Sequence, residues 1–223
     1  MVDWDRVDTV LLDMDGTLLD LRFDNFFWRE HVPGEFARVN DLSLAEACEV
    51  LFPRMIELRG TLDWYCVEFW TRELGLDIVA MKHALRQRIA VREGAEPFLD
   101  AVRGSGRSQV LVTNAHERTL DIKVAQTGIG AYFERLVSAH AYGTPKETAD
   151  FWCRLTEDIA IDPARSLFID DSEAVLDAAV AFGFAQVLGV SRPDSGLPPA
   201  PHPRLSNVDS FADLMPIPGL RRA

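Results

Sequence analysis

The stretch TVLLDMDGTLLD, Thr9 to Asp20, joins an apolar run to two nearby carboxylates, Asp13 and Asp15. The run is short and β-branched at its start, and it stops at Gly16, which predicts a buried strand followed by a tight turn. Two like charges this close repel each other, and removing them from water is costly unless something compensates. Because open α/β sheets bind ligands at the carboxyl ends of their strands, we expect a cation at this turn.

The composition limits the classes of partner. The chain has 223 residues, 48% of them hydrophobic, which is enough to bury a full core. Its formal net charge of -12 disfavours a nucleic-acid polymer or an anionic membrane as partner, because nothing would offset the repulsion. The same field repels a phosphorylated metabolite, so a site for one must carry its own positive charge.

Cysteine usage and the amino-terminal segment indicate a cytoplasmic protein. The N-terminus lacks a basic segment and an apolar signal core, and no apolar run is long enough to span a bilayer. The cysteines are odd in number and without metal-site spacing, which predicts reduced, packed thiols. They are Cys48, Cys66 and Cys153. The isolated histidines His31, His83, His140 and His202 show no ligand spacing either.

The order of apolar runs predicts the fold class. Four runs are expected to form strands: Thr9–Asp15, Ser108–Asn114, Ser166–Asp171 and Ala185–Val190. Helical patterns separate the later runs, and strands that alternate with helices give an α/β fold with a doubly wound parallel sheet. Residues 21–92 show helical spacing without a convincing strand. We expect a core over residues 1–20 and 93–223, with 21–92 as a helical cap that acts as a lid.

Polar side chains follow three of the expected strands. They are Asp13 and Asp15, then Thr113 and Asn114, then Asp170 and Asp171, and Lys146 precedes the last of these strands. Several carboxylates favour Mg²⁺, and a hydroxyl and an ammonium suit the oxygens of a phosphoryl group. In such a site Asp13 can attack phosphorus and form an acyl phosphate, while Asp15 protonates the leaving oxygen and later takes a proton from water.

These residues resemble the motifs of a known family. DMDGT (Asp13–Thr17), Thr113 after an apolar strand, Lys146 in GTPK, and DD (Asp170–Asp171) are similar, in order, to the four motifs of the haloacid dehalogenase superfamily. The resemblance implies a Rossmann-like core, an aspartyl-phosphate intermediate and Mg²⁺ as cofactor.

The resemblance also implies a role for each matching residue. Asp13 is the nucleophile and a metal ligand, and Asp15 is the acid/base whose backbone carbonyl contacts the metal. Thr113, Asn114 and Lys146 are the expected phosphate-binding residues. Asp170 is a metal ligand, and Asp171 is counted with it, although Asp171 could instead pair with a cation or cap the following helix.

Longer segments resemble the GMP/IMP 5′-nucleotidase branch of this superfamily. They are LDLRFDNFFW (Leu19–Trp28), LDWYCVEFW (Leu62–Trp70), TNAHERTL (Thr113–Leu120), LFIDDSEAVLDAA (Leu167–Ala179) and GVSRPDSG (Gly189–Gly196). The branch implies a purine nucleoside 5′-monophosphate as substrate, GMP or IMP first. Candidate specificity residues are Asn25, Trp28, Trp64 and His116, although core packing is the alternative for the aromatic residues and a plain surface position for the histidine.

Other functions stay open at this point. The same motifs suit a phosphatase for sugar phosphates or phosphoglycolate, or a mutase that shelters its phospho-aspartate from water. A binding protein that kept the fold and lost turnover is a third alternative. Carbon–halogen hydrolysis is disfavoured, because the family's dehalogenases lack the aspartate that stands here as Asp15. Either a monomer or a homodimer is compatible with the sequence.

Overall fold

A parallel sheet forms the centre of the protein. The computed structural model describes residues 2–220, and within them the sheet has six strands in the order β3-β2-β1-β4-β5-β6. The strands are β1 (Thr9–Leu12), β2 (Ser108–Thr113), β3 (Arg135–Ser138), β4 (Ser166–Asp170), β5 (Gln186–Val190) and β6 (Asn207–Val208). Every pair of neighbours is parallel. The α/β class predicted from the sequence is therefore confirmed.

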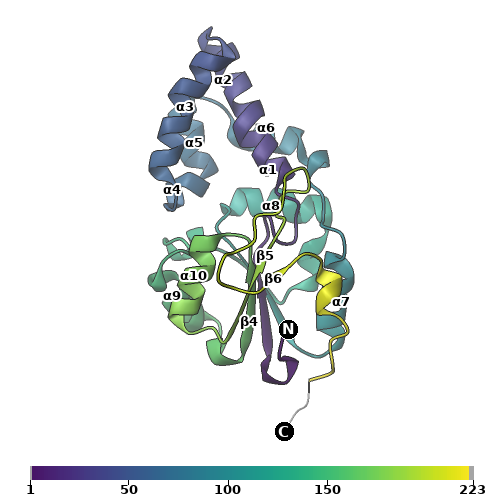
Figure 1. Ribbon diagram of the computed structural model, residues 1–223. Coiled ribbons are helices and arrows are strands. Elements are labelled where there is room, and N and C mark those ends of the chain that lie inside the picture. The colour runs from purple at the N-terminus through teal and green to yellow at the C-terminus, as the bar shows by residue number, and fades with distance from the viewer. Residues whose placement is uncertain (1, 221–223) are drawn as a thin grey trace.

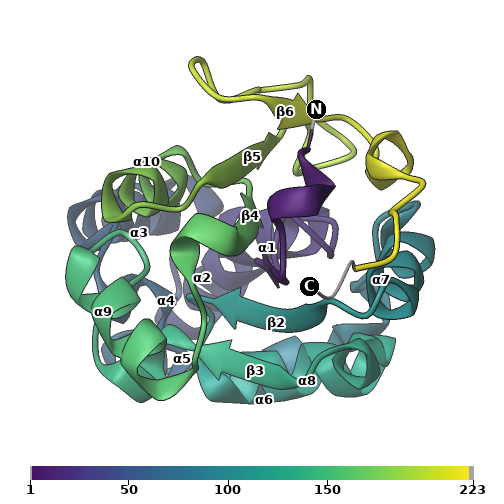
Figure 2. The same ribbon diagram turned by 90° about the horizontal axis from the view of Figure 1, so that it is seen from below.

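Helices cover both faces of the sheet (Figures 1 and 2). The helices of the two faces are α7 (Ala95–Gly104) and α8 (Glu117–Thr127) on one side, and α9 (Ala149–Asp158) and α10 (Glu173–Phe182) on the other. Alternate residues of a strand point to opposite faces. In β1, Val10 and Leu12 join one apolar cluster and Leu11 joins the other, and all three are completely buried. The continuous apolar run thus reflects burial on both sides.

The part of the chain over residues 21–92, between β1 and β2, is helical, as expected. Its helices are α1 (Arg22–Phe26), α2 (Val32–Asn40), α3 (Leu44–Leu58), α4 (Leu62–Tyr65), α5 (Val67–Leu74) and α6 (Ile78–Ala84), and a π-helical turn over Phe27–His31 joins the first two. We call residues 21–92 the helical segment. It lies above the carboxyl ends of the strands in Figure 1, and its Phe23, Phe27 and Trp70 belong to the same apolar cluster as one face of the sheet.

Short 3-10 turns complete the chain. They are Trp4–Arg6, Arg86–Arg88, Ile129–Tyr132, Ala139–Tyr142, Pro163–Arg165 and Phe211–Leu214. Across residues 2–220, the structure contains no helix with the length and apolarity needed to cross a bilayer.

The strand order reverses at β1. The chain runs outward from β1 through β2 to β3, and then returns to the other side of β1 as β4. Loops leave in opposite directions at such a point and open a crevice at the carboxyl ends of the strands. The site expected from the sequence lies at this reversal.

Candidate active site

Sheet register brings Asp13 and Asp170 side by side. Leu12 at the end of β1 pairs with Ile169 of β4, so the aspartate that follows each strand residue lies at the same level. The Asp13 N–H continues the ladder by donating to the Ile169 carbonyl at 3.0 Å. Both carboxylates are buried, with 5% of Asp13 and 1% of Asp170 exposed. Two neighbouring strands thus deliver two carboxylates to one buried position.

Lys146 neutralises this pair. Its Nζ donates to Asp13 Oδ1 at 2.5 Å, to Asp170 Oδ2 at 2.7 Å and to the Val112 carbonyl at 3.0 Å. Burial raises the pKa of Asp13 to about 7, with Asp170 adding to the rise and Lys146 opposing it. Burial alone would lower the pKa of Lys146, but the charges of Asp13 and Asp170 raise it. The ammonium of Lys146 therefore stays charged between the two acids.

A third carboxylate completes an acidic cluster suited to a hard cation. One oxygen from each of Asp13, Asp170 and Asp171 lies within 4.8 Å of the others. Burial raises the pKa of Asp171 well above its ordinary value, and the neighbouring Asp170 and Asp13 raise it further. Oxygen donors of this kind are the ligands that Mg²⁺ prefers, and its charge would relieve their repulsion. The donor set therefore fits the Mg²⁺ expected from the sequence.

Gly16 makes room for Asp171. Its backbone has a φ of +85°, in the left-handed region that glycine adopts without strain. A Cβ at this position would lie 2.4 Å from Asp171 Oδ2. The glycine that ends the DMDG turn therefore allows a carboxylate from β4 to approach the turn after β1.

A second network of buried charges lies beside the first. Lys123 of α8 donates from Nζ to Asp15 Oδ1 at 2.6 Å and to Asp24 Oδ2 at 2.5 Å. Lys82 of α6 donates to the other oxygen of Asp24 at 2.9 Å and lies over the Phe27 ring, 4.5 Å from its centroid. The lysine side chains are 1% and 3% exposed. This network joins the DMDG turn, the core helix α8 and two helices of the helical segment.

Burial and pairing act in opposite directions on these acids. Burial would raise the pKa of Asp24, but the ammonium groups of Lys123 and Lys82 lower it well below its usual range. For Asp15 burial prevails, and its pKa is raised although Lys123 opposes the change. Asp24 is thus a fixed anion, whereas Asp15 exchanges a proton more readily.

This network was not predicted from the sequence. One feature of the sequence pointed to it: the chain has only three lysines, Lys82, Lys123 and Lys146. A strongly acidic chain that retains three lysines and buries all of them, each 1–2% exposed, uses them as internal counter-ions.

The polar residues after β2 lie at the same edge of the sheet. The Thr113 hydroxyl accepts a hydrogen bond from the Ala115 N–H at 3.1 Å. The Asn114 amide accepts from the Lys146 N–H at 2.9 Å and donates to Glu147 at 2.9 Å. Asn114 therefore fixes the backbone that carries Lys146.

Tyr65 extends this contact into the helical segment. Its hydroxyl donates to Glu147 Oε1 at 2.7 Å. Burial and the Glu147 charge both raise the pKa of Tyr65, so the hydroxyl keeps its proton and remains a donor. Neither Tyr65 nor Glu147 was singled out from the sequence, because nothing local distinguishes them.

Two of the candidate specificity residues, Trp28 and Trp64, contact Trp70. The rings of Trp28 and Trp70 lie 5.9 Å apart, and the backbone carbonyl of Trp64 accepts a hydrogen bond from the Trp70 indole at 2.9 Å. Both candidates are partly buried against the apolar cluster of the helical segment. These contacts favour the core-packing alternative for much of each side chain.

The other two candidates make polar contacts. Asn25 of α1 donates to Asp194 Oδ2 at 2.6 Å, which joins the helical segment to the loop after β5. His116 precedes α8 and accepts the Arg118 N–H on Nδ1 at 3.3 Å.

Comparison with known proteins defines the class. The family described as haloacid dehalogenase-like hydrolase matches residues 7–183. The GMP/IMP nucleotidase YrfG of Escherichia coli (strain K12) is 43% identical over 215 residues, which cover 96% of this chain and 97% of that protein. The chain therefore belongs to the haloacid dehalogenase-like hydrolase family, as its motifs predicted.

Solved structures agree with this fold. A HAD phosphatase from Thermococcus onnurineus is similar, with a TM-score of 0.79 and 20% identity over 93% of this chain and 96% of that chain. The L-2-haloacid dehalogenase from Xanthobacter autotrophicus gives a TM-score of 0.61 and 19% identity over the same shares. At these identities the two structures support the fold alone.

The Gly16→Ala variant tests the fit around Asp171. The added Cβ displaces the carboxylate, so Mg²⁺ affinity is expected to fall roughly tenfold or more, as it does when other supports of metal ligands are removed. Isothermal titration with Mg²⁺ measures the change. Gly128→Ala is the matched control, because Gly128 has a φ of +73° and nothing within 4 Å of the added Cβ. Equal Mg²⁺ affinity in the two variants would contradict the assignment.

The Asp24→Asn variant tests the second network. Removing this anion leaves two buried ammonium groups with less compensation, so the free energy of unfolding is expected to drop by about 3 kcal/mol or more. Urea denaturation at pH 7 measures the drop. Asp100→Asn, which removes an exposed partner of Arg103, is the control and changes stability by less than about 1 kcal/mol.

Lowering the pH is expected to reduce the difference in free energy of unfolding between Asp24→Asn and the parent protein. The folded pKa of Asp24 is depressed, so its contribution is complete above the unfolded value of about 4 and is lost as the pH falls below it. A stability difference that stays constant from pH 7 to pH 3 would show that the charge of Asp24 is not what stabilises the fold.

Proposed function

We propose that this protein is a Mg²⁺-dependent phosphomonoesterase that hydrolyses purine nucleoside 5′-monophosphates, with GMP and IMP as the preferred substrates. The proposed substrate class is supported by the 43% identity to a GMP/IMP nucleotidase over 96% of this chain. The match includes the helical segment, which lies over the acidic cluster and so faces whatever is attached to the phosphate.

Asp13 is the proposed nucleophile. Lys146 holds its carboxylate at 2.5 Å in a fixed direction, so an oxygen is oriented for attack on phosphorus. The new bond joins a carboxylate oxygen of Asp13 to phosphorus, and the bond from phosphorus to the 5′-oxygen breaks. A Mg²⁺ ion, for which Asp13, Asp170 and Asp171 would be the ligands, would supply positive charge against the phosphoryl oxygens.

Asp15 is the proposed general acid and base. It gives its proton to the departing 5′-oxygen, then takes one from the water that attacks the phospho-aspartate, and the carboxylate of Asp13 is restored. Burial raises the pKa of Asp15, which favours a proton on it when substrate arrives. Lys123, at 2.6 Å, stabilises the carboxylate that forms when the proton leaves.

The phosphate-binding residues proposed here are Thr113, Asn114 and Lys146. In this proposal Lys146 binds a phosphoryl oxygen, and the hydroxyl of Thr113, the last residue of β2, contacts another. Asn114 supports Lys146 through the hydrogen bond that it accepts from the Lys146 N–H. Lys146 and Thr113 are thus proposed to contact the phosphoryl group, whereas Asn114 positions Lys146.

We infer that the helical segment is a cap that opens. Asp13, Asp170 and Lys146 are nearly inaccessible, so a nucleotide needs the segment to move before it can bind. The two connections to the core run together, with a β-bridge between Leu19 and Val91. A pair of linked, extended connections is suited to act as a hinge for residues 21–92.

The Asp13→Asn variant tests the covalent mechanism. An amide does not form the acyl phosphate, so phosphate release from GMP is expected to fall to background while the thermal transition persists. Phosphate release and circular dichroism give the two readouts. Asp5→Asn, at an exposed position, is the control. Substantial turnover by a folded Asp13→Asn protein would rule out this nucleophile.

A substrate panel tests the nucleotide preference. With Mg²⁺ present, kcat/KM for GMP and IMP is expected to exceed that for ribose 5-phosphate by on the order of tenfold or more, because stacking of one base contributes ~1–3 kcal/mol. Phosphoglycolate and sugar phosphates serve as the comparison esters. Equal or greater kcat/KM for any of these would overturn the substrate assignment, and an isomerised product without free phosphate would indicate a mutase.

A further inference from the structure

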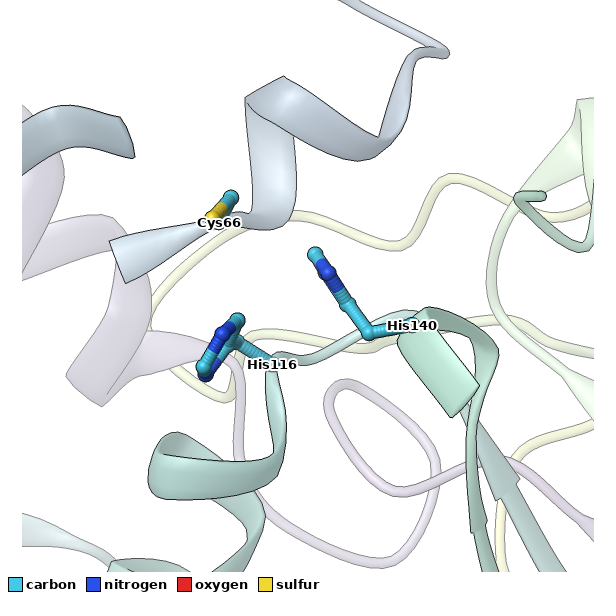
Figure 3. Close-up of side chains that lie close together, drawn as sticks. All are labelled: Cys66, His116 and His140. Carbon is cyan, nitrogen blue, oxygen red and sulfur yellow. The ribbon is translucent and has the colours of Figure 1, made fainter. Parts of the chain in front are cut away.

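Three side chains with soft or borderline donor atoms meet outside the acidic cluster. Cys66, His116 and His140 each offer one ligand atom, and these atoms lie within 4.8 Å of one another (Figure 3). We call this group the cysteine–histidine cluster. The two imidazole rings are edge to face with centroids 4.8 Å apart. Neither the Mg²⁺ site nor the phosphate-binding residues use any of the three.

The cluster joins the helical segment to the core. Cys66 lies between α4 and α5, whereas His116 precedes α8 and His140 lies in the turn Ala139–Tyr142 after β3. Figure 3 shows the thiol facing the two rings from the opposite chain segment. No metal site was predicted from the sequence here, because the three residues are far apart along the chain and only folding brings them together.

His140 is ready to act as a ligand. Its Nε2 is buried and has no hydrogen-bond partner among residues 2–220, which is costly for a polar atom unless something binds it. Burial and the neighbouring His116 lower the pKa of His140, which keeps its ring neutral.

The other two members, Cys66 and His116, each accept a hydrogen bond from a nearby backbone N–H. The Cys66 sulfur accepts the Phe69 N–H at 3.3 Å at the start of α5, a position that favours negative charge. His116 accepts a long hydrogen bond from Arg118, and coordination by this ring would replace that weak contact. Acidic Asp63 and Glu117 near His140 add a field that attracts a cation.

We propose that the cysteine–histidine cluster is a site for Zn²⁺ or a similar transition-metal ion that holds the helical segment against the core. One thiolate and two imidazoles are donors that Zn²⁺ prefers and Mg²⁺ avoids. Tetrahedral coordination needs ligand atoms about 3.5 Å apart, so a small inward movement completes the site. Binding releases the Cys66 thiol proton, and water or a substrate group takes the fourth position.

The position of this site implies inhibition of turnover. This part rests on the proposed function, because it assumes that the helical segment opens for each substrate molecule. A metal ion that binds both sides stabilises the closed arrangement, since only that arrangement presents all three ligands. Zn²⁺ would therefore slow hydrolysis without displacing Mg²⁺ from the acidic cluster.

Cobalt spectroscopy tests the site without an activity assay. The full-length protein, kept in excess Mg²⁺, is titrated with Co²⁺, and one equivalent is expected to give a thiolate-to-cobalt charge-transfer band. The Cys66→Ser variant keeps a helix cap at α5 and is expected to lose the band. The half-buried Cys48→Ser control keeps it. Absence of the band in the parent protein, or its persistence in Cys66→Ser, would overturn the proposal.

Histidine variants test the remaining ligands. His116→Asn retains an acceptor for the Arg118 N–H, and His140→Asn retains a polar side chain, but both remove the imidazole that would bind the metal. Each is expected to weaken Zn²⁺ binding, measured by competition with a chromophoric chelator, by more than roughly tenfold. His83→Gln, at an exposed position, leaves it unchanged. Unaltered affinity in both asparagine variants would refute the site.

Inhibition is measured separately with GMP and saturating Mg²⁺. The Zn²⁺ concentration for half inhibition is expected to rise at least tenfold in Cys66→Ser and to stay constant in Cys48→Ser. Equal inhibition of all three proteins would refute the effect on opening. A protein that hydrolyses no nucleotide but still gives the cobalt band would refute the proposed function and leave the metal site supported.

Discussion

Burial of carboxylates at the carboxyl ends of β1 and β4 is the constraint on which the rest of the structure depends. Carboxylates held in a fixed orientation inside the protein are removed from water, and each buried charge then needs a positive neighbour. Lys146 meets this need for Asp13 and Asp170, and Lys123 meets it for Asp15. The chain carries a net charge of -12, yet it places its few lysines inside the molecule rather than on the surface. The ammonium groups of Lys146 and Lys123 therefore lie beside the carboxylates, where a phosphate ester would need positive charge.

The same charges determine how the helical segment meets the core. The sheet is held by apolar clusters on both faces, whereas Asp24 reaches Lys123 of α8 from α1, and Tyr65 reaches Glu147. Polar contacts at such a junction are directional and exchange with water when the parts separate, unlike a large apolar interface. These directional contacts therefore specify how the helical segment is placed against the core.

Much of the core was predictable because the signal is local. Strands buried on both faces appear as continuous apolar runs, and the acids that follow them mark the reversal point of the sheet. The edge strand β3 was missed because it is short and half exposed, and β6 has only two residues. Lys123 and Asp24 were missed for a different reason. Periodicity shows that a residue lies on a helix, but only the packing of that helix shows which charge it faces.

The burial of all three lysines also affects how the protein reacts with small reagents. Each lysine Nζ is enclosed in the closed arrangement, so an acylating agent that attacks primary amines finds no exposed lysine in the described part of the chain. Modification of Lys82 or Lys123 requires the helical segment to separate from α8 or the chain to unfold locally. The rate of lysine acylation, followed by mass spectrometry, therefore measures how often these buried side chains become exposed.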